Sequence, residues 1–236
     1  ALSSVPDGAV DAAGDGPWAD LPGLPTGAVR ALAHAPDGTL WLLLDDAGSF
    51  SLLRFDGAAA VTVSDGAPAG PWHALAVRGD GVYLATDAGL HRCALWPEGG
   101  FALTAVAAVP EAVHALAVLD DGTLACAGAD GLALLDAADA LAERRLPGLS
   151  LRAALFAGGR WYLATGQALL LQSGGQLYRY EGEAVSEQTP DWQPIADADA
   201  ATVQSPLPAV RALAVTPDGR LWLGTAAGLA RWGVAG

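Results

Sequence analysis

The sequence predicts an all-β fold: a single closed β-propeller of about five four-stranded blades, whose last blade is completed by the N-terminal strand. The main observation is a segment that recurs five times with similar spelling. Its copies are VRALAHAPDGTLWLLL from Val29, WHALAVRGDGVYLAT from Trp72, VHALAVLDDGTLACAG from Val113, LRAALFAGGRWYLAT from Leu151 and VRALAVTPDGRLWLGT from Val210. The second residues of consecutive copies lie 43, 41, 38 and 59 positions apart. Strand-like repeats with a period of about 40 residues are typical of propeller blades.

A tight turn in each copy separates two predicted strands. The first strand is a short run of Ala, Leu and Val, and the turns are Asp37-Gly38, Asp80-Gly81, Asp121-Gly122, Gly158-Gly159 and Asp218-Gly219. Asp-Gly and Gly-Gly between apolar runs favour a hairpin, because such turns need positive φ. The second strand carries an aromatic residue in four copies, namely Trp41, Tyr83, Tyr162 and Trp222.

Two further strands are expected in each blade. A second glycine-bearing turn leads to a third strand, as in LLRFDG (52–57) and LYRYEG (177–182), and a weaker fourth strand follows. These units predict one domain over residues 1–236, with blades at about 29–70, 71–111, 112–149, 150–208 and 209–236 plus 16–25. The long spacing before Arg211 leaves a sixth blade as the alternative, although two insertions account for the extra length.

The two ends of the chain are expected to meet in the last blade. The fifth copy stops at Gly236 after its third strand, so it lacks a fourth. The stretch GPWADLPGLP (16–25) is similar to the fourth-strand stretch DWQPIAD (191–197), and both precede a first strand. We therefore expect residues 16–25 to supply the missing outer strand, which closes the ring and leaves no free blade interface.

The repeat resembles the two-component regulator propeller repeat. PDGRLWLGTAAGL (217–229) matches its LW-x-GT and Gly-Leu pattern closely, and PDGTLWLLL (36–44) and GDGVYLATDAGL (79–90) are recognisable variants. The resemblance extends over most of the chain and implies the propeller fold. Relatives with this repeat include sensor regions of membrane histidine kinases and secreted proteins that dock other chains, and they usually have more blades. The resemblance therefore implies a binding role outside the cytoplasm.

Composition limits the classes of partner. The formal net charge is −14, whereas binding to nucleic acid needs a basic surface, so we expect no nucleic-acid partner. No apolar run approaches the roughly 18 residues that cross a bilayer, so no membrane span is expected. The chain begins at Ala1, which fits a mature protein without its signal peptide or a trimmed chain. The absence of Lys, Asn and Met indicates a GC-rich bacterial genome.

One position of the repeat predicts a ligand site. The second residue of each first strand is basic or can become basic, and we call these five residues the collar: Arg30, His73, His114, Arg152 and Arg211. In a propeller they form a ring at one end of the channel. Guanidinium and imidazole groups gathered there would hold a carboxylate, a phosphate or an acidic side chain. The alternative is structural: the five side chains bond to backbone carbonyls of neighbouring blades and seal the channel.

Signals for catalysis, metals and cofactors are poor. The sequence has no G-x-S-x-G, no H-E-x-x-H, no phosphate loop and no cysteine-metal motif, so we expect no catalytic residue, metal or cofactor. Four aspartates near the strands, Asp45, Asp46, Asp87 and Asp130, are interpreted as turn residues with structural roles. Asp197 and Asp199 in the insertion ADADAATVQSP (196–206) are interpreted as solvated loop rather than calcium ligands.

The two cysteines and the function each leave an alternative open. Cys93 and Cys126 belong to consecutive blades and are expected to be buried thiols, with a disulfide across the interface as the alternative.

The function expected is a non-catalytic binding or scaffold propeller outside the cytoplasm, presenting one face to a protein partner or a small anionic ligand. It would be a sensor-type module or an accessory subunit. The alternative is a lyase, with His73 or His114 as general base, or a glycoside hydrolase acting on a carbohydrate or acidic substrate.

Overall fold

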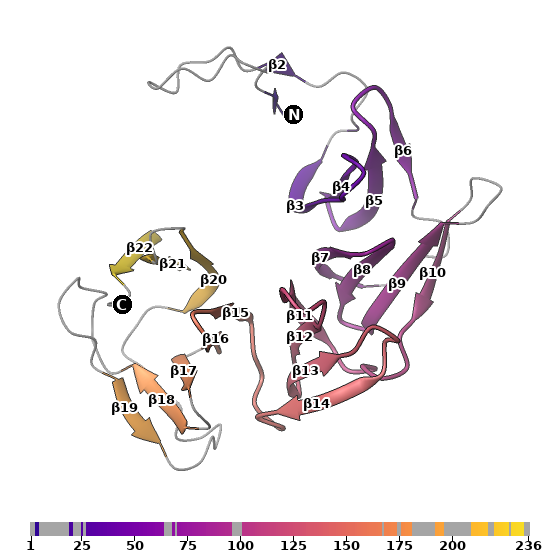
Figure 1. Cartoon of the computed structure of the whole chain (residues 1–236). Coiled ribbons are helices and arrows are strands. Elements are labelled where there is room, and N and C mark those ends of the chain that lie inside the picture. Colours follow the sequence, from indigo (N-terminus) through magenta and orange to yellow (C-terminus); the bar gives the residue numbers. More distant parts are fainter. Residues whose placement is uncertain are drawn as a thin grey trace.

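The structure is a computed structural model, and its regular elements are strands. It describes residues 3–4, 19–20, 25, 27–63, 68, 70–95, 101–166, 168–173, 176–180, 192–195, 209–216, 220–226 and 228–233. Apart from the two-stranded sheet of Ser3–Ser4 and Ala19–Asp20, the strands form five antiparallel sheets arranged one after another around a common axis (Figure 1). The chain is therefore a five-bladed β-propeller, which confirms the predicted fold class and leaves no sixth blade among the described residues.

The blades follow one another in chain order. Blade one holds β3 (Ala28–His34), β4 (Leu40–Asp46), β5 (Ser49–Phe55) and β6 (Ala60–Thr62). Blade two holds β7 (Trp72–Arg78), β8 (Gly81–Thr86), β9 (Gly89–Leu95) and β10 (Phe101–Ala105). Blade three holds β11 (Val113–Val118), β12 (Leu124–Gly128), β13 (Gly131–Leu135) and β14 (Leu141–Arg145). Blade four holds β15 (Ala153–Ala157), β16 (Arg160–Ala164), β17 (Leu169–Ser173), β18 (Gln176–Tyr180) and β19 (Trp192–Ile195). Blade five holds β20 (Val210–Val215), β21 (Arg220–Thr225) and β22 (Gly228–Gly233).

Blade four corrects one detail of the sequence prediction. The stretch from Leu177, expected to be the third strand, lies in β18, which is the fourth strand of a five-stranded sheet. The third strand is β17, because Leu169 and Leu171 pair with Ala164 and Tyr162 of β16. Part of the extra length before Arg211 is thus an additional strand within the same blade, so a fold of five blades accommodates it.

The N-terminal residues also differ from the prediction. β2 (Ala19–Asp20) pairs with β1 (Ser3–Ser4) and not with β22, and the rest of residues 16–25 except Pro25 lies outside the described residues. The predicted closure of the last blade by this stretch is therefore not made by the residues described, and blades five and one stand apart (Figure 1). Pro17, Pro22 and Pro25 have no N–H to donate, so this stretch is a poor template for a continuous ladder along β22.

The core lies between neighbouring blades, because alternate residues of each strand face opposite sides of its sheet. Leu84 of β8 faces blade one and packs in the same cluster as Trp41 of that blade, while Tyr83 and Ala85 face blade three. The same alternation keeps the two cysteines apart. Cys93 of blade two packs toward blade one, whereas Cys126 of blade three packs against the opposite face of blade two. Both are free, buried thiols, as predicted, and the disulfide alternative is wrong. Burial raises the pKa of the Cys93 thiol to about 11 and that of Cys126 to about 12.

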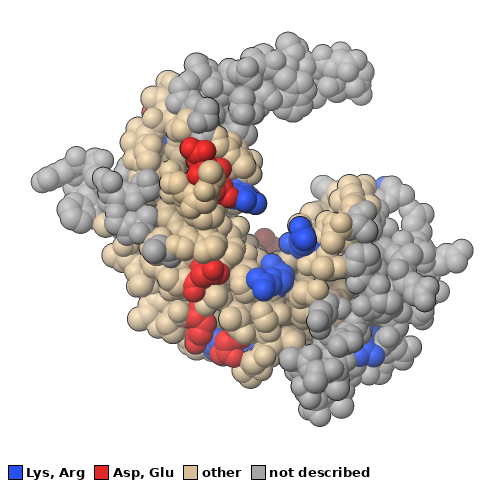
Figure 2. Space-filling view, turned by 180° about the vertical axis from the view of Figure 1, so that it is seen from behind, with Lys and Arg blue, Asp and Glu red and all other residues tan. Residues whose placement is uncertain are grey.

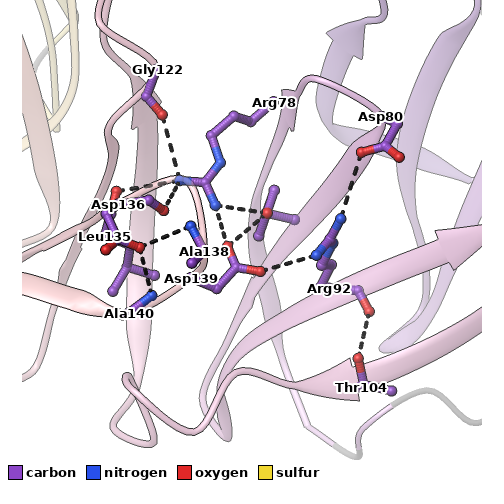
Figure 3. A network of polar contacts seen from close by, with 11 residues as sticks. Arg78, Asp80, Arg92, Thr104, Gly122, Leu135, Asp136, Ala138, Asp139 and Ala140 are labelled. Carbon is purple, nitrogen blue, oxygen red and sulfur yellow. Dashed lines mark hydrogen bonds and ion pairs between the residues drawn. The ribbon is translucent and has the colours of Figure 1, made fainter.

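A polar network joins blades two and three (Figure 3). The Arg78 guanidinium donates to the Asp139 carboxylate, to the Tyr83 hydroxyl at 2.8 Å and to the Asp136 carbonyl at 2.8 Å. Arg92 donates to the same Asp139 carboxylate at 3.2 Å. One carboxylate therefore pairs with two guanidinium groups from the neighbouring blade, and Arg78 is also anchored by a backbone carbonyl.

The stability of the propeller should fall in mild acid because of a buried histidine. His91 of β9 is only 8% exposed, and burial lowers its pKa from the model-peptide value, with a smaller opposing effect from the Gly89 backbone. The folded state then binds fewer protons than the unfolded state below a pH of about 6.5, so the free energy of unfolding decreases as the pH falls through this range. His91→Gln removes this titration and should flatten the acid side of the stability curve.

Urea unfolding at pH 7.5 and pH 5.0 measures this effect. His34→Gln is the matched control, because it makes the same chemical change at an exposed position of β3 and should keep the wild-type pH dependence. If the free energy of unfolding falls by the same amount between pH 7.5 and pH 5.0 in His91→Gln and in the wild type, the prediction is wrong.

Candidate functional site

The collar residues share one backbone irregularity. In blade one, Val29 pairs with Leu44 but Ala31 pairs with Leu43, so Arg30 is an extra residue in β3. The same shift by one residue occurs at His73, His114 and Arg211. A β-bulge of this kind turns the extra side chain out of the regular alternation of the strand. The repeated bulge therefore explains how a basic side chain can point away from the core in an apolar inner strand.

In blade four the collar residue precedes the inner strand. The Arg152 N–H donates to the Ala164 carbonyl at 2.7 Å, and the regular ladder of β15 begins at Ala153. Arg152 thus occupies the place that corresponds to the bulge in the other blades. All five blades present their collar side chain at the same end of the inner strand.

The structure brings all five collar side chains to one cavity of about 750 Å³. The remaining lining residues are Phe50, Pro71, Trp72, Gly166, Ala209 and Val210. Figure 2 shows arginine atoms gathered around the central hollow on this face, one group of them against acidic atoms. The sequence-based expectation that the five positions converge at one end of the axis therefore agrees with the geometry. Their role in binding a ligand stays a prediction.

Two collar residues contact acidic side chains. The Arg30 Nε donates to the Asp45 carboxylate at 2.9 Å, and the His73 Nε2 lies 2.7 Å from the Asp87 Oδ1. The hydrogen bond from Arg30, followed by the one from the Gly48 backbone, lowers the pKa of Asp45.

These contacts bring Asp45 and Asp87, interpreted from the sequence as structural turn residues, up to the collar. Register explains the approach: the end of the second strand lies beside the start of the first, as in the pairing of Ala28 with Asp45. An aspartate in the turn after the second strand therefore reaches the collar. In blade three the corresponding Asp130 bonds instead to Arg144 at 2.9 Å and to the Gly148 N–H at 2.6 Å, in a structural role as expected. The sequence carried this signal, because hairpin register alone places the second turn at the collar end.

His114 makes the type of contact that the structural alternative requires. Its Nδ1 lies 2.8 Å from the Leu151 carbonyl of the next blade. Because a carbonyl only accepts, Nδ1 carries the proton and the Nε2 lone pair stays free while the ring is neutral. Burial is the main cause that lowers the pKa of His114, and the charges of Arg152 and His73 act in the same direction. His114 is therefore a neutral imidazole at pH 7.

The guanidinium groups of Arg152 and Arg211 have no ion-pair partner within the described part of the chain. Both residues are exposed and line the cavity. Two positive charges without a counter-charge thus face one cavity of a protein whose formal net charge is −14. The insertion 196–206, with Asp197 and Asp199, lies outside the described residues.

A comparison with protein families supports the repeat. Residues 205–227 match the family described as two component regulator propeller. This stretch carries the two-component regulator propeller repeat. The match covers both β20 and β21, the first two strands of blade five, which lie in the part of the chain that carried the closest resemblance. No curated protein matches the sequence, and the described residues include no helix that could cross a bilayer.

Several solved structures are similar to this propeller. A protein from Lactobacillus plantarum has 17% identity and a TM-score of 0.57, over 94% of this chain and 72% of that one. The extracellular domain of a putative hybrid two component system from B. thetaiotaomicron has 19% identity and a TM-score of 0.57, over 91% of this chain but only 28% of that one. Catalytically inactive virginiamycin B lyase from Staphylococcus aureus, with quinupristin, has 12% identity and a TM-score of 0.52, over 88% and 84%. At these identities the similarity extends to the fold alone.

Proposed function

We propose that this chain is a non-catalytic binding propeller that holds a small anionic ligand, a carboxylate or a phosphate, in the collar cavity. The observation that carries the proposal is the convergence of five basic or potentially basic side chains on one cavity, two of them arginines without an acidic partner among the described residues. The planar guanidinium group can hold carboxylate and phosphate oxygens through two parallel hydrogen bonds. A cavity of about 750 Å³ lies in the size range of small-molecule sites.

The walls of the cavity favour an anion over other ligands. Among the described residues that line it there is no aspartate or glutamate, and the carboxylates of Asp45 and Asp87 beside it are engaged by Arg30 and His73. Phe50 and Trp72, whose rings lie 6.0 Å apart, supply an apolar side. Because Arg30 is paired with Asp45, the charges of Arg152 and Arg211 are the main electrostatic attraction for an anionic ligand. The ligand would therefore combine an anionic group with a compact apolar or hydroxylated body.

The proposed setting is extracytoplasmic, as a sensor-type module or an accessory subunit with a protein partner. The two-component regulator propeller repeat and the similarity to an extracellular domain of a putative two component system support this setting. This chain spans 28% of the chain of that extracellular domain.

Calorimetric titration at low ionic strength tests the proposal, with inorganic phosphate and citrate as probes. The wild type should bind at least one of them at a single site. Arg152→Gln and Arg211→Gln should each weaken binding by about 10-fold, since hydrogen bonds to charged groups contribute roughly 1.5–3 kcal/mol. Arg160→Gln is the control, because it removes the same charge from the opposite end of the inner hairpin of blade four. Failure of both probes to bind, or equal affinity in all variants, would overturn the proposal.

The second candidate function is an acid–base enzyme such as a lyase. The pair of His73 with Asp87 beside the neutral imidazole of His114 favours it, because a histidine with a free Nε2 lone pair can accept a proton. A glycoside hydrolase is less well supported, since it needs two carboxyl groups and the described lining has none. Proton NMR of a bound ligand after prolonged incubation separates the two functions: an unchanged ligand supports binding, and conversion that is lost in His114→Ala supports the enzyme.

A further inference from the structure

We propose that His73, Asp87 and His114 form a binding site for a divalent transition-metal ion of the Zn²⁺ class at the edge of the collar cavity. One potential ligand atom from each residue lies within 4.8 Å of the others. Two imidazoles and a carboxylate are a common ligand set for such ions, and a three-residue set leaves coordination positions open. The spacing 73, 87 and 114 matches no sequence motif, because the fold alone brings the three side chains together.

His114 is prepared for this role by its second nitrogen. Its Nδ1–H donates to the Leu151 carbonyl at 2.8 Å, which fixes the tautomer and the direction of the ring. Metal-binding histidines usually donate their other N–H to a carbonyl or carboxylate in the same manner. The remaining nitrogen, Nε2, then holds a lone pair and is the expected ligand.

His73 and Asp87 complete the site from blade two. The His73 ring lies 5.2 Å from the His114 ring between centroids, at an interplanar angle of 66°. The His73 Nε2 contacts the Asp87 Oδ1 at 2.7 Å, and the side chains expose 27% and 49% of their surface. Zinc–nitrogen bonds of about 2.0 Å place ligand atoms roughly 3.3 Å apart, so modest rotation of these accessible side chains would close the site.

The neighbouring charges give the site a specific property. Arg152 lies close enough to His114 for its charge to act on that ring, so a bound cation and this guanidinium oppose each other. An anion that contacts both would relieve the repulsion. Resting on the proposed function, the metal would thus favour ligands whose carboxylate or phosphate oxygens can bind a metal ion and an arginine together.

Zinc titration of protein treated with a chelator tests the site, in a buffer free of phosphate. The wild type should bind one Zn²⁺ ion, and His73→Ala, Asp87→Ala and His114→Ala should each weaken binding by at least about 10-fold. His34→Ala is the matched control, because it removes an exposed histidine of β3 and should leave the affinity unchanged. In the wild type, nitrogen-15 NMR should show that Zn²⁺ shifts the ring nitrogens of His73 and His114 and leaves those of His34 unchanged. This readout needs no variant to fold.

Arg152→Gln separates the metal site from the anion site. It should weaken phosphate binding to the metal-free protein, but it should not weaken Zn²⁺ binding, since it removes a repulsive charge. Equal Zn²⁺ affinity in the wild type and the His73 and His114 variants, or unshifted imidazole signals, would overturn the metal site even if phosphate binds. Failure of the wild type to bind phosphate or citrate, with normal Zn²⁺ binding, would instead overturn the proposed function and leave the metal site standing.

Discussion

Asp139→Asn should lower the free energy of unfolding by about 3 kcal/mol, because removing one partner of a buried ion pair leaves an uncompensated charge. The Arg78 and Asp139 side chains expose only 9% and 15% of their surface. Asp139 also accepts from Arg92 and from the Tyr83 hydroxyl at 2.8 Å, so one carboxylate serves three donors between blades two and three (Figure 3). Asparagine keeps the size of the residue and tolerates its positive φ of 62°.

Asp80→Asn is the matched control in the same network. Asp80 lies 3.6 Å from Arg92, but its side chain is 96% exposed, so this pair should contribute less than about 1 kcal/mol. Urea unfolding of both variants measures the difference. If Asp139→Asn is destabilised no more than Asp80→Asn, the network does not hold the two blades together.

Gly131→Ala should destabilise the propeller by about 3 kcal/mol or more, for two reasons that add. Gly131 has a φ of 81°, and a residue with a Cβ loses about 1–2 kcal/mol there. The added Cβ would also overlap the backbone carbonyl oxygens of Arg145 and Leu146. Overpacking of this kind costs about 1–3 kcal/mol. The Gly131 N–H donates to the Leu149 carbonyl at 2.9 Å, so any shift would also disturb the connection to blade four.

Gly122→Ala separates the two causes. Gly122 has the same φ of 81°, but an added Cβ would meet no atom within 4 Å. This variant should therefore show the backbone strain alone, about 1 kcal/mol. Thermal and urea unfolding of the two variants give the comparison, and equal destabilisation would show that the carbonyls near Gly131 can move away without cost.

The five blades, their hairpins and the alignment of the collar were predictable from the sequence, because each depends on local chemistry. Asp-Gly turns need positive φ, alternation in a strand decides which residues face a neighbouring blade, and a repeat of about 40 residues counts the blades. The collar was found by comparing one position across five copies, namely Arg30, His73, His114, Arg152 and Arg211. The buried thiols of Cys93 and Cys126 were also predicted from the sequence.

Other features depended on how strands pair, and only the tertiary structure decided them. The bulge at His73 exists only in relation to the register of β8. His114 comes from the next blade, so its distance from His73 depends on packing between sheets. The extra strand of blade four and the pairing of Ala19–Asp20 with Ser3–Ser4 are likewise choices among competing partners. Sequence determines which residues can serve as strand, turn or ligand, whereas the free energy of pairing and packing distant segments determines which of them meet.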